Sequence, residues 1–262
     1  MKKLIPLILI LASSFAHAQT TAILGAFNTE VTLIKSHIKH PKEIIIQHIH
    51  FTKGTLNGCH VVLAQTGMGK VNAAITTSLM LDHFKPNQVL FTGISGGVDP
   101  QLSPGDLVIG SKVTYHDYGT ITPDSMYHRA TQDPVTSLSN PLYFPSATKL
   151  VQLAQNVSGK LVLQKIQGRV PKIVTGVIVT GDVFVSSTTA TQQLWAKMHA
   201  EATEMEGAAV AQACWQVKTP FLIIRCLSDS ASNNAHDDVA AFYQTAAYNS
   251  ATLVMAIIGK IK

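Results

Sequence analysis

The feature that most restricts the fold is a unit in which a short apolar stretch runs into a turn and then into a helix. In residues 203–209, an extended segment carries Glu204 and Glu206 and then breaks at Gly207 into an apolar helical run over residues 208–217. Strands that alternate with helices in this way predict an α/β fold. We therefore expect a single domain, a three-layer sandwich with a central mixed, mostly parallel sheet.

The same pattern recurs along most of the chain. Strands are expected at residues 21–26, 43–52, 60–66, 89–92, 106–117, 161–166, 172–180, 203–206 and 221–229. Helices are expected from the N-cap Asn28 and over about 66–83, 146–157, 208–217 and 237–258. Residues 93–97 are predicted to form a glycine-rich turn. Residues 118–145 are predicted to form a long loop, which in a compact domain is usually functional or part of an interface.

The first 18 residues have the organisation of a secretory signal peptide. Two lysines precede an apolar run over residues 4–12, and Ala16-His17-Ala18 matches a cleavage site. The run is too short to span a bilayer. We therefore expect residues 1–18 to be removed and residues 19–262 to form one mature domain, periplasmic or secreted, with no membrane segment.

Composition limits the partners and the redox chemistry. The formal net charge is +5, with 13% charged and 46% hydrophobic residues. Basic residues are not gathered into a stripe, so no nucleic-acid partner is expected. The three cysteines, Cys59, Cys214 and Cys226, are too few for a disulfide framework, although one bridge among them stays open.

Neither a metal nor another cofactor is expected. The eleven histidines show no His-x-x-x-His or Cys/His ligand spacing. The turn at residues 66–70, Thr-Gly-Met-Gly-Lys, resembles a phosphate loop. Its spacing is wrong for one, and Val71 stands where a metal-binding Ser or Thr is needed.

Side chains suited to chemistry lie at five predicted strand ends, where an open α/β sheet binds its ligands. They are Glu30, the glycine turn with Ile94, Ser95 and Gly96, Phe184, Met205 with Glu206, and Ser228 with Asp229. Glu206 is suited to accept both hydroxyls of a ribose, and Phe184 to stack on a base. Asp229 is suited to protonate a departing purine and Glu30 to activate a water, the division of labour in inverting glycosyl hydrolysis. The plainer interpretation of Glu204 and Glu206 is an acid pair at a helix N-terminus.

Seven motifs, in this order and spacing, point to one known family. They are Gly25-Ala-Phe-Asn-Thr-Glu30-Val-Thr-Leu, Gly54-x-Leu-Asn-Gly58, Thr66-Gly-Met-Gly-Lys-Val71, Tyr115-His-Asp117, Thr180-Gly-Asp-Val-Phe184, Glu204-Met-Glu206 and Arg225-x-x-Ser-Asp229. Together they resemble the bacterial 5′-methylthioadenosine/S-adenosylhomocysteine nucleosidases of the nucleoside phosphorylase superfamily. The resemblance implies a nucleosidase domain over residues 19–262 that hydrolyses the N-glycosidic bond of these or related adenine nucleosides and releases adenine.

The resemblance also implies roles for single residues. It makes Glu30 the water-activating base and Asp229 the acid at the purine N7. It places Glu206 on the ribose hydroxyls, with Met205 beneath the sugar, and Phe184 against the adenine ring.

Further positions are implied to surround the substrate. They are Val185 at the base edge, Met68 near the sugar, Ser228 beside the acid and Arg225 near the attacking water. Two departures from the family pattern stand out. Ile94 and then Ser95 replace a Ser-Ala pair in the glycine turn, which removes a hydroxyl near the nucleophile and leaves another one position away. The loop at 118–145 also diverges, where the family forms a 5′-substituent pocket across a homodimer interface.

Two other functions stay open. A purine nucleoside phosphorylase has the same fold, but it must hold phosphate, and arginine is the natural bidentate partner. The first strand turn and the central glycine turn contain no Arg or Lys. A non-catalytic exported nucleoside-binding or storage protein is the other possibility, although a binder needs no paired acid and base.

Overall fold

The computed structural model describes residues 19–261, so the predicted signal peptide lies outside the described residues. Its strands are β1 (Thr20–Gly25), β2 (Lys39–Ile46), β3 (Ile49–Leu56), β4 (Cys59–Gln65), β5 (Gln88–Phe91), β6 (Ile94–Gly97), β7 (Leu107–Tyr115), β8 (Gly119–Ile121), β9 (Met126–His128), β10 (Phe144–Pro145), β11 (Ile173–Thr180), β12 (Ala200–Glu204) and β13 (Phe221–Asp229). Its helices are α1 (Asn28–His37), α2 (Lys70–Phe84), α3 (Thr148–Ser158), α4 (Thr188–Met198), α5 (Gly207–Gln216) and α6 (Ala235–Ile258).

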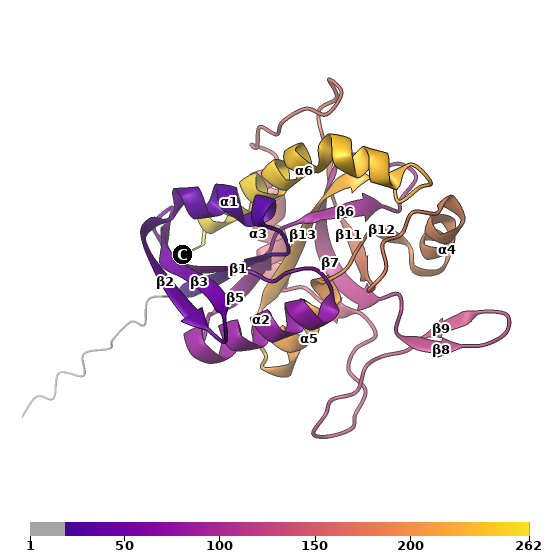
Figure 1. The fold of residues 1–262 in the computed structure, drawn as a ribbon, viewed down its shortest axis with the longest axis horizontal. Helices are drawn as coiled ribbons and strands as arrows, with labels where there is room; N and C mark the ends of the chain where they lie inside the picture. Colours follow the sequence, from indigo (N-terminus) through magenta and orange to yellow (C-terminus); the bar gives the residue numbers. More distant parts are fainter. Residues whose placement is uncertain (1–18, 262) are drawn as a thin grey trace, which may run out of the picture.

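One mixed sheet runs through the molecule, with helices on both faces (Figure 1). Its eleven strands are ordered β10-β7-β11-β12-β6-β13-β5-β1-β4-β3-β2. Helices α1, α3 and α6 cover one face and α2 and α5 the other, so the predicted α/β fold with a mixed central sheet is confirmed. In addition β13 pairs with β7, which closes β7, β11, β12, β6 and β13 into a ring that the sequence did not predict.

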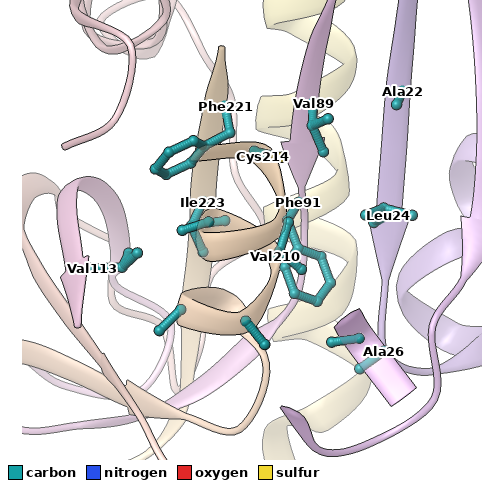
Figure 2. Close-up of a cluster of buried hydrophobic side chains, with 14 of the residues drawn as sticks. Ala22, Leu24, Ala26, Val89, Phe91, Val113, Val210, Cys214, Phe221 and Ile223 are labelled. Atoms are coloured by element: carbon teal, nitrogen blue, oxygen red, sulfur yellow. The ribbon is translucent and has the colours of Figure 1, made fainter. Parts of the chain in front are cut away.

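The central strands are buried on both faces. On β1, Ala22 and Leu24 lie in the core under α2 and α5, while Ile23 lies in the core under α1, α3 and α6. Figure 2 shows the first of these cores, where Val210 of α5 faces Phe91. Strands covered on both sides appear in sequence as continuous apolar runs, which explains why their positions were predictable.

Several local predictions were wrong. The expected strand at 161–166 is irregular, because its backbone pairs with a side chain instead of a strand: Gln164 exchanges hydrogen bonds of 2.8 and 2.9 Å with the Asn249 amide. The expected strand at 43–52 is divided between β2 and β3 by a turn with positive φ at Gln47 and His48. Phe27, and not Asn28, is the N-cap of α1.

Other differences concern loops. The expected glycine turn at 93–97 is largely a strand, β6, paired with β12 and β13. The expected loop at 118–145 contains β8 and β9, which form a projecting hairpin (Figure 1). Helix α4 was not predicted, although Ser187, which caps it by accepting from Ala190 N at 3.3 Å, is a usual N-cap residue.

Within residues 19–261, no helix is long and apolar enough to cross a membrane. All three cysteines are free thiols, so the bridge left open by the sequence is not formed.

Candidate active site

Glu30 is held by backbone amides at the entrance to α1. Its Oε2 accepts from Ala26 N at 2.6 Å and Phe27 N at 3.0 Å, and its Oε1 accepts from Ile94 N at 3.0 Å. The side chain is only 1% exposed. Burial raises the pKa of Glu30, against the opposing effect of Arg225 and the three amides. A buried carboxylate with a raised pKa is a suitable base for a water molecule.

Arg225 is a buried cation beside this carboxylate. Its Nη2 lies 2.6 Å from Glu204 Oε2, and its guanidinium lies 4.1 Å above the centre of the Phe91 ring. A Cβ on residue 93 would lie 3.0 Å from both Arg225 Nη1 and Glu30 Oε1. Gly93 therefore leaves the space in which Arg225 and Glu30 approach each other.

Glu204 is a buried carboxylate of this site to which the sequence assigned no role. Besides Arg225, it accepts hydrogen bonds from Glu206 N at 3.1 Å and Gly207 N at 2.7 Å, and from the Thr180 hydroxyl. It therefore fixes the N-terminus of α5, the end of β11 and Arg225 at one point. The sequence signals for Glu204 were its position in the strand before a helix and its place in the motif Glu204-Met-Glu206.

Glu206 lies at the same strand-to-helix junction. Its Oε1 accepts from Gly69 N at 2.8 Å, while Oε2 is 3.9 Å from Arg225 Nη2, beyond hydrogen-bond length. Oε2 is therefore able to accept from a ligand hydroxyl. Burial and the neighbouring Glu204 raise the pKa of Glu206.

Asp229 ends β13 and is positioned by its neighbours. Its Oδ1 accepts from Ala231 N at 2.7 Å and its Oδ2 from Ser228 Oγ at 2.8 Å. A Cβ on Gly96 would lie 2.9 Å from Asp229 Oδ1, so this carboxyl group is packed against β6. Burial raises the pKa of Asp229 to about 6, which suits a proton donor near neutral pH.

The candidate base-binding residues line one small cavity. It is about 30 Å³ in volume and is lined by Gly96, Val183, Phe184, Val185, Thr203, Glu204, Met205 and Asp229. A space of that size holds about one or two water molecules and not a purine. Phe184, 46% exposed, stacks on His236 of α6 with ring centroids 4.7 Å apart. His236 was not predicted from the sequence, and it is not among the residues that line the cavity.

Three other residues predicted from the sequence, Met68, Ile94 and Ser95, make no hydrogen bond through their side chains to the carboxyl groups of the site, as far as the described residues extend. Met68 is 51% exposed, in the turn that also carries Gly69, which contacts Glu206. The Ile94 side chain packs on the α1 and α6 side, and its neighbour Ser95 on the same strand points to the opposite face. Ser95 Oγ is buried and has no hydrogen-bond partner among residues 19–261. The Ser95 hydroxyl therefore does not take the place of the hydroxyl that a serine at position 94 would put beside Glu30.

No cluster of three or more His, Cys, Asp or Glu side chains in the described part of the chain is arranged to hold a metal ion. The site is thus built from carboxyl groups, one buried guanidinium, backbone amides and apolar side chains.

Comparison with known proteins agrees with this geometry. The family model of the phosphorylase superfamily matches residues 20–259. A 5′-methylthioadenosine/S-adenosylhomocysteine nucleosidase of Bacillus velezensis is 37% identical over 241 residues, which are 92% of this chain and 98% of that protein.

Solved structures show the same fold. The nucleosidase of that name from Neisseria meningitidis, in complex with methylthio-immucillin-A, superposes with a TM-score of 0.81 at 34% identity, covering 93% of this chain and 100% of that one. The futalosine hydrolase of Helicobacter pylori superposes with a TM-score of 0.78 at 27% identity, covering 93% and 99%. This chain belongs to the phosphorylase superfamily and, within it, to the 5′-methylthioadenosine/S-adenosylhomocysteine nucleosidase family.

Proposed function

We propose that this protein hydrolyses the N-glycosidic bond of 5′-methylthioadenosine, S-adenosylhomocysteine or a closely related adenine nucleoside and releases adenine. One observation carries the mechanism: Glu30 and Asp229 lie against the two ends of the same short segment. A Cβ at residue 93 would lie 3.0 Å from Glu30 Oε1, and one at residue 96 would lie 2.9 Å from Asp229 Oδ1. Three residues of strand span about 10 Å. The two carboxyl groups are therefore held at separate places along one segment, and inverting glycosyl hydrolysis uses two separate carboxyl groups.

The two groups act on opposite sides of the bond that breaks. Glu30 takes a proton from a water molecule, and the water oxygen attacks C1′ of the ribose. The C–N bond breaks as Asp229 delivers a proton to the purine N7, so adenine leaves as a neutral molecule. Glu206 accepts from the ribose hydroxyls through Oε2, and Arg225 partly balances the charge of the buried carboxylates.

Phosphorolysis is the less favoured reaction on this scaffold. Arg225 is the cation next to Glu30, and its Nη2 is already paired with Glu204 at 2.6 Å. Within the described residues, neither the turn after β1 nor the segment between β5 and β6 contains an Arg or Lys. A phosphate dianion at the nucleophile position would therefore face Glu30 without an unpaired cation.

The test is adenine release by purified protein from 5′-methylthioadenosine, with and without phosphate. We expect turnover in phosphate-free buffer, formation of 5-methylthioribose, and loss of both in Glu30→Gln. Turnover that requires phosphate would identify a phosphorylase, and binding without adenine release would identify a binding protein. Because the fold is shared with a hydrolase named for futalosine, S-adenosylhomocysteine and other 5′-substituted adenosines belong in the same assay.

A homodimer is part of this proposal. Exposed apolar side chains on α2, Val71 (68%) and Ile75 (47%), lie on the helix that borders a groove of about 440 Å³ between α2, α5 and Pro134 of the long loop. A second copy of the chain would cover them. We expect Ile75→Glu to yield a monomer in sedimentation, while Val162→Glu, at an 89% exposed position outside this groove, leaves the dimer intact. A wild-type monomer with full activity would contradict the proposal.

Export from the cytoplasm is the last part of this proposal. The pattern of residues 1–18 favours a cleaved signal peptide and a mature chain that begins at Gln19 in the periplasm or outside the cell. N-terminal sequencing of the protein from a periplasmic extract is the measurement, and an intact Met1 on a cytoplasmic product would contradict it.

A further inference from the structure

The lysine of the glycine turn resembles a phosphate-binding lysine in sequence, but its charge is used elsewhere. Lys70 Nζ lies 2.6 Å from Asp117 Oδ2 and 3.6 Å from Asp182 Oδ2. The backbone amide of Lys70 also donates to Asp182 Oδ1 at 2.8 Å, at the first turn of α2. The two carboxylates come from different segments: Asp117 lies two residues after the end of β7, and Asp182 lies two residues after the end of β11.

The cluster also joins the two aspartates to each other. Asp182 N donates to Asp117 Oδ2 at 2.8 Å, so this oxygen accepts both from Lys70 Nζ and from the backbone of Asp182. The ammonium lies 5.5 Å from the centre of the Tyr115 ring, which restricts it further. We call Lys70, Asp117 and Asp182 the clamp.

The backbone around the clamp fits closely. A Cβ on Gly181 would lie 2.4 Å from His116 Cε1 and 3.0 Å from Asp117 Cγ, so a larger residue here would force these side chains to shift. His116 N donates to Thr180 O at 2.8 Å, and Gly181 N donates to Glu204 O at 3.0 Å. The end of β11 is therefore fixed on both sides immediately before Asp182.

The clamp stands between two parts of the proposed site. On one side, Gly69 precedes Lys70 and donates to Glu206, the proposed ribose carboxylate, at 2.8 Å. On the other side, Asp182 is followed by Val183, Phe184 and Val185, which line the base cavity. The connection from the clamp to the base cavity is one peptide unit long.

We propose that the clamp is a positioning element, which sets the adenine-contacting segment 183–185 at a fixed place relative to Glu206. This inference rests on the proposed function, because it assigns the cavity to adenine. Lys70 contacts neither the cavity nor the reacting atoms; it acts through Asp182.

The test compares Lys70→Met and Lys70→Arg with the wild type. Lys35→Met is the matched control, because Lys35 of α1 forms a partly exposed ion pair of 2.9 Å with Glu43 of β2. Lys70→Met leaves the Gly69–Glu206 backbone bond in place, so the sugar contact should persist. We expect Lys70→Met to raise the Kd for adenine about tenfold, because the free energy contributed by a hydrogen bond between charged groups corresponds to a factor of that size. The Kd for 5-methylthioribose should change less than about twofold.

Lys70→Arg should restore most of the adenine affinity, because it returns a cation to the two aspartates. Amide hydrogen exchange should accelerate in residues 181–187 of Lys70→Met and stay unchanged in Lys35→Met. Equal losses for adenine and 5-methylthioribose, or unchanged exchange in 181–187, would overturn the clamp. Failure of the wild type to bind or release adenine would instead overturn the proposed function, while the exchange measurement would still report on the clamp.

Discussion

Asp229→Asn separates leaving-group protonation from the other parts of the mechanism. The structure predicts that this substitution preserves the site. In the wild type Asp229 Oδ1 accepts from Ala231 N at 2.7 Å, and an asparagine Oδ1 at this position can accept the same hydrogen bond. The asparagine Nδ2 takes the place of Asp229 Oδ2, which lies 2.8 Å from Ser228 Oγ. It can donate to this hydroxyl, because a hydroxyl accepts as well as donates. The fold should therefore persist while the proton is lost.

The expected effect is large. General acid catalysis contributes about 10²–10⁴-fold, so adenine release should slow by at least about 10²-fold. That factor corresponds to about 3 kcal/mol of lost transition-state stabilisation. A nucleoside analogue with a 4-nitrophenolate leaving group departs as an anion and needs no proton, so its hydrolysis should partly escape the loss.

The assay is turnover of both substrates by the wild type, Asp229→Asn and the control Asp237→Asn, which changes an exposed acid on α6. The control should retain activity on both substrates. If Asp229→Asn slowed both substrates equally, Asp229 would not be the leaving-group acid. A lower melting temperature with equal losses would indicate a structural role instead.

Three further predictions follow from the same geometry. Glu30→Gln should slow adenine and nitrophenolate substrates alike, because water attack is common to both; a loss confined to one substrate would contradict the assigned base. Because burial raises the pKa of Asp229 to about 6, its protonated form is lost as pH rises through that value, so kcat/KM should fall on the alkaline side and this fall should vanish in Asp229→Asn. Glu204→Gln should lower the free energy of unfolding in urea by about 3 kcal/mol, because it leaves Arg225 buried without its ion-pair partner. Glu43→Gln, which breaks a partly exposed pair, should cost less than about 1 kcal/mol, and equal costs would contradict the reasoning.

The sequence by itself determined the strand-to-helix units and the acids at their ends. Glu30 and Asp229 were found because each follows an apolar run, and such a run marks a central strand from local pattern alone. Glu206 was found from the carboxylate pair that breaks at Gly207 into an apolar helix. The positions of β1, β5 and β13 depend on that same local pattern, and all three are present in the structure. The roles of these acids stay predictions.

Only the tertiary structure decided which of these ends meet and what each charge faces. The Glu204–Arg225 pair, the stack of Phe184 on His236 and the clamp of Lys70 with two aspartates join segments that lie far apart in the chain or in different elements. Local spacing carries no information on such contacts, because they depend on strand order and on the pairing of β13 with both β6 and β7. For the same reason the glycines at 93 and 96 looked like a turn, although the space they leave is set by Glu30, Arg225 and Asp229 across the sheet.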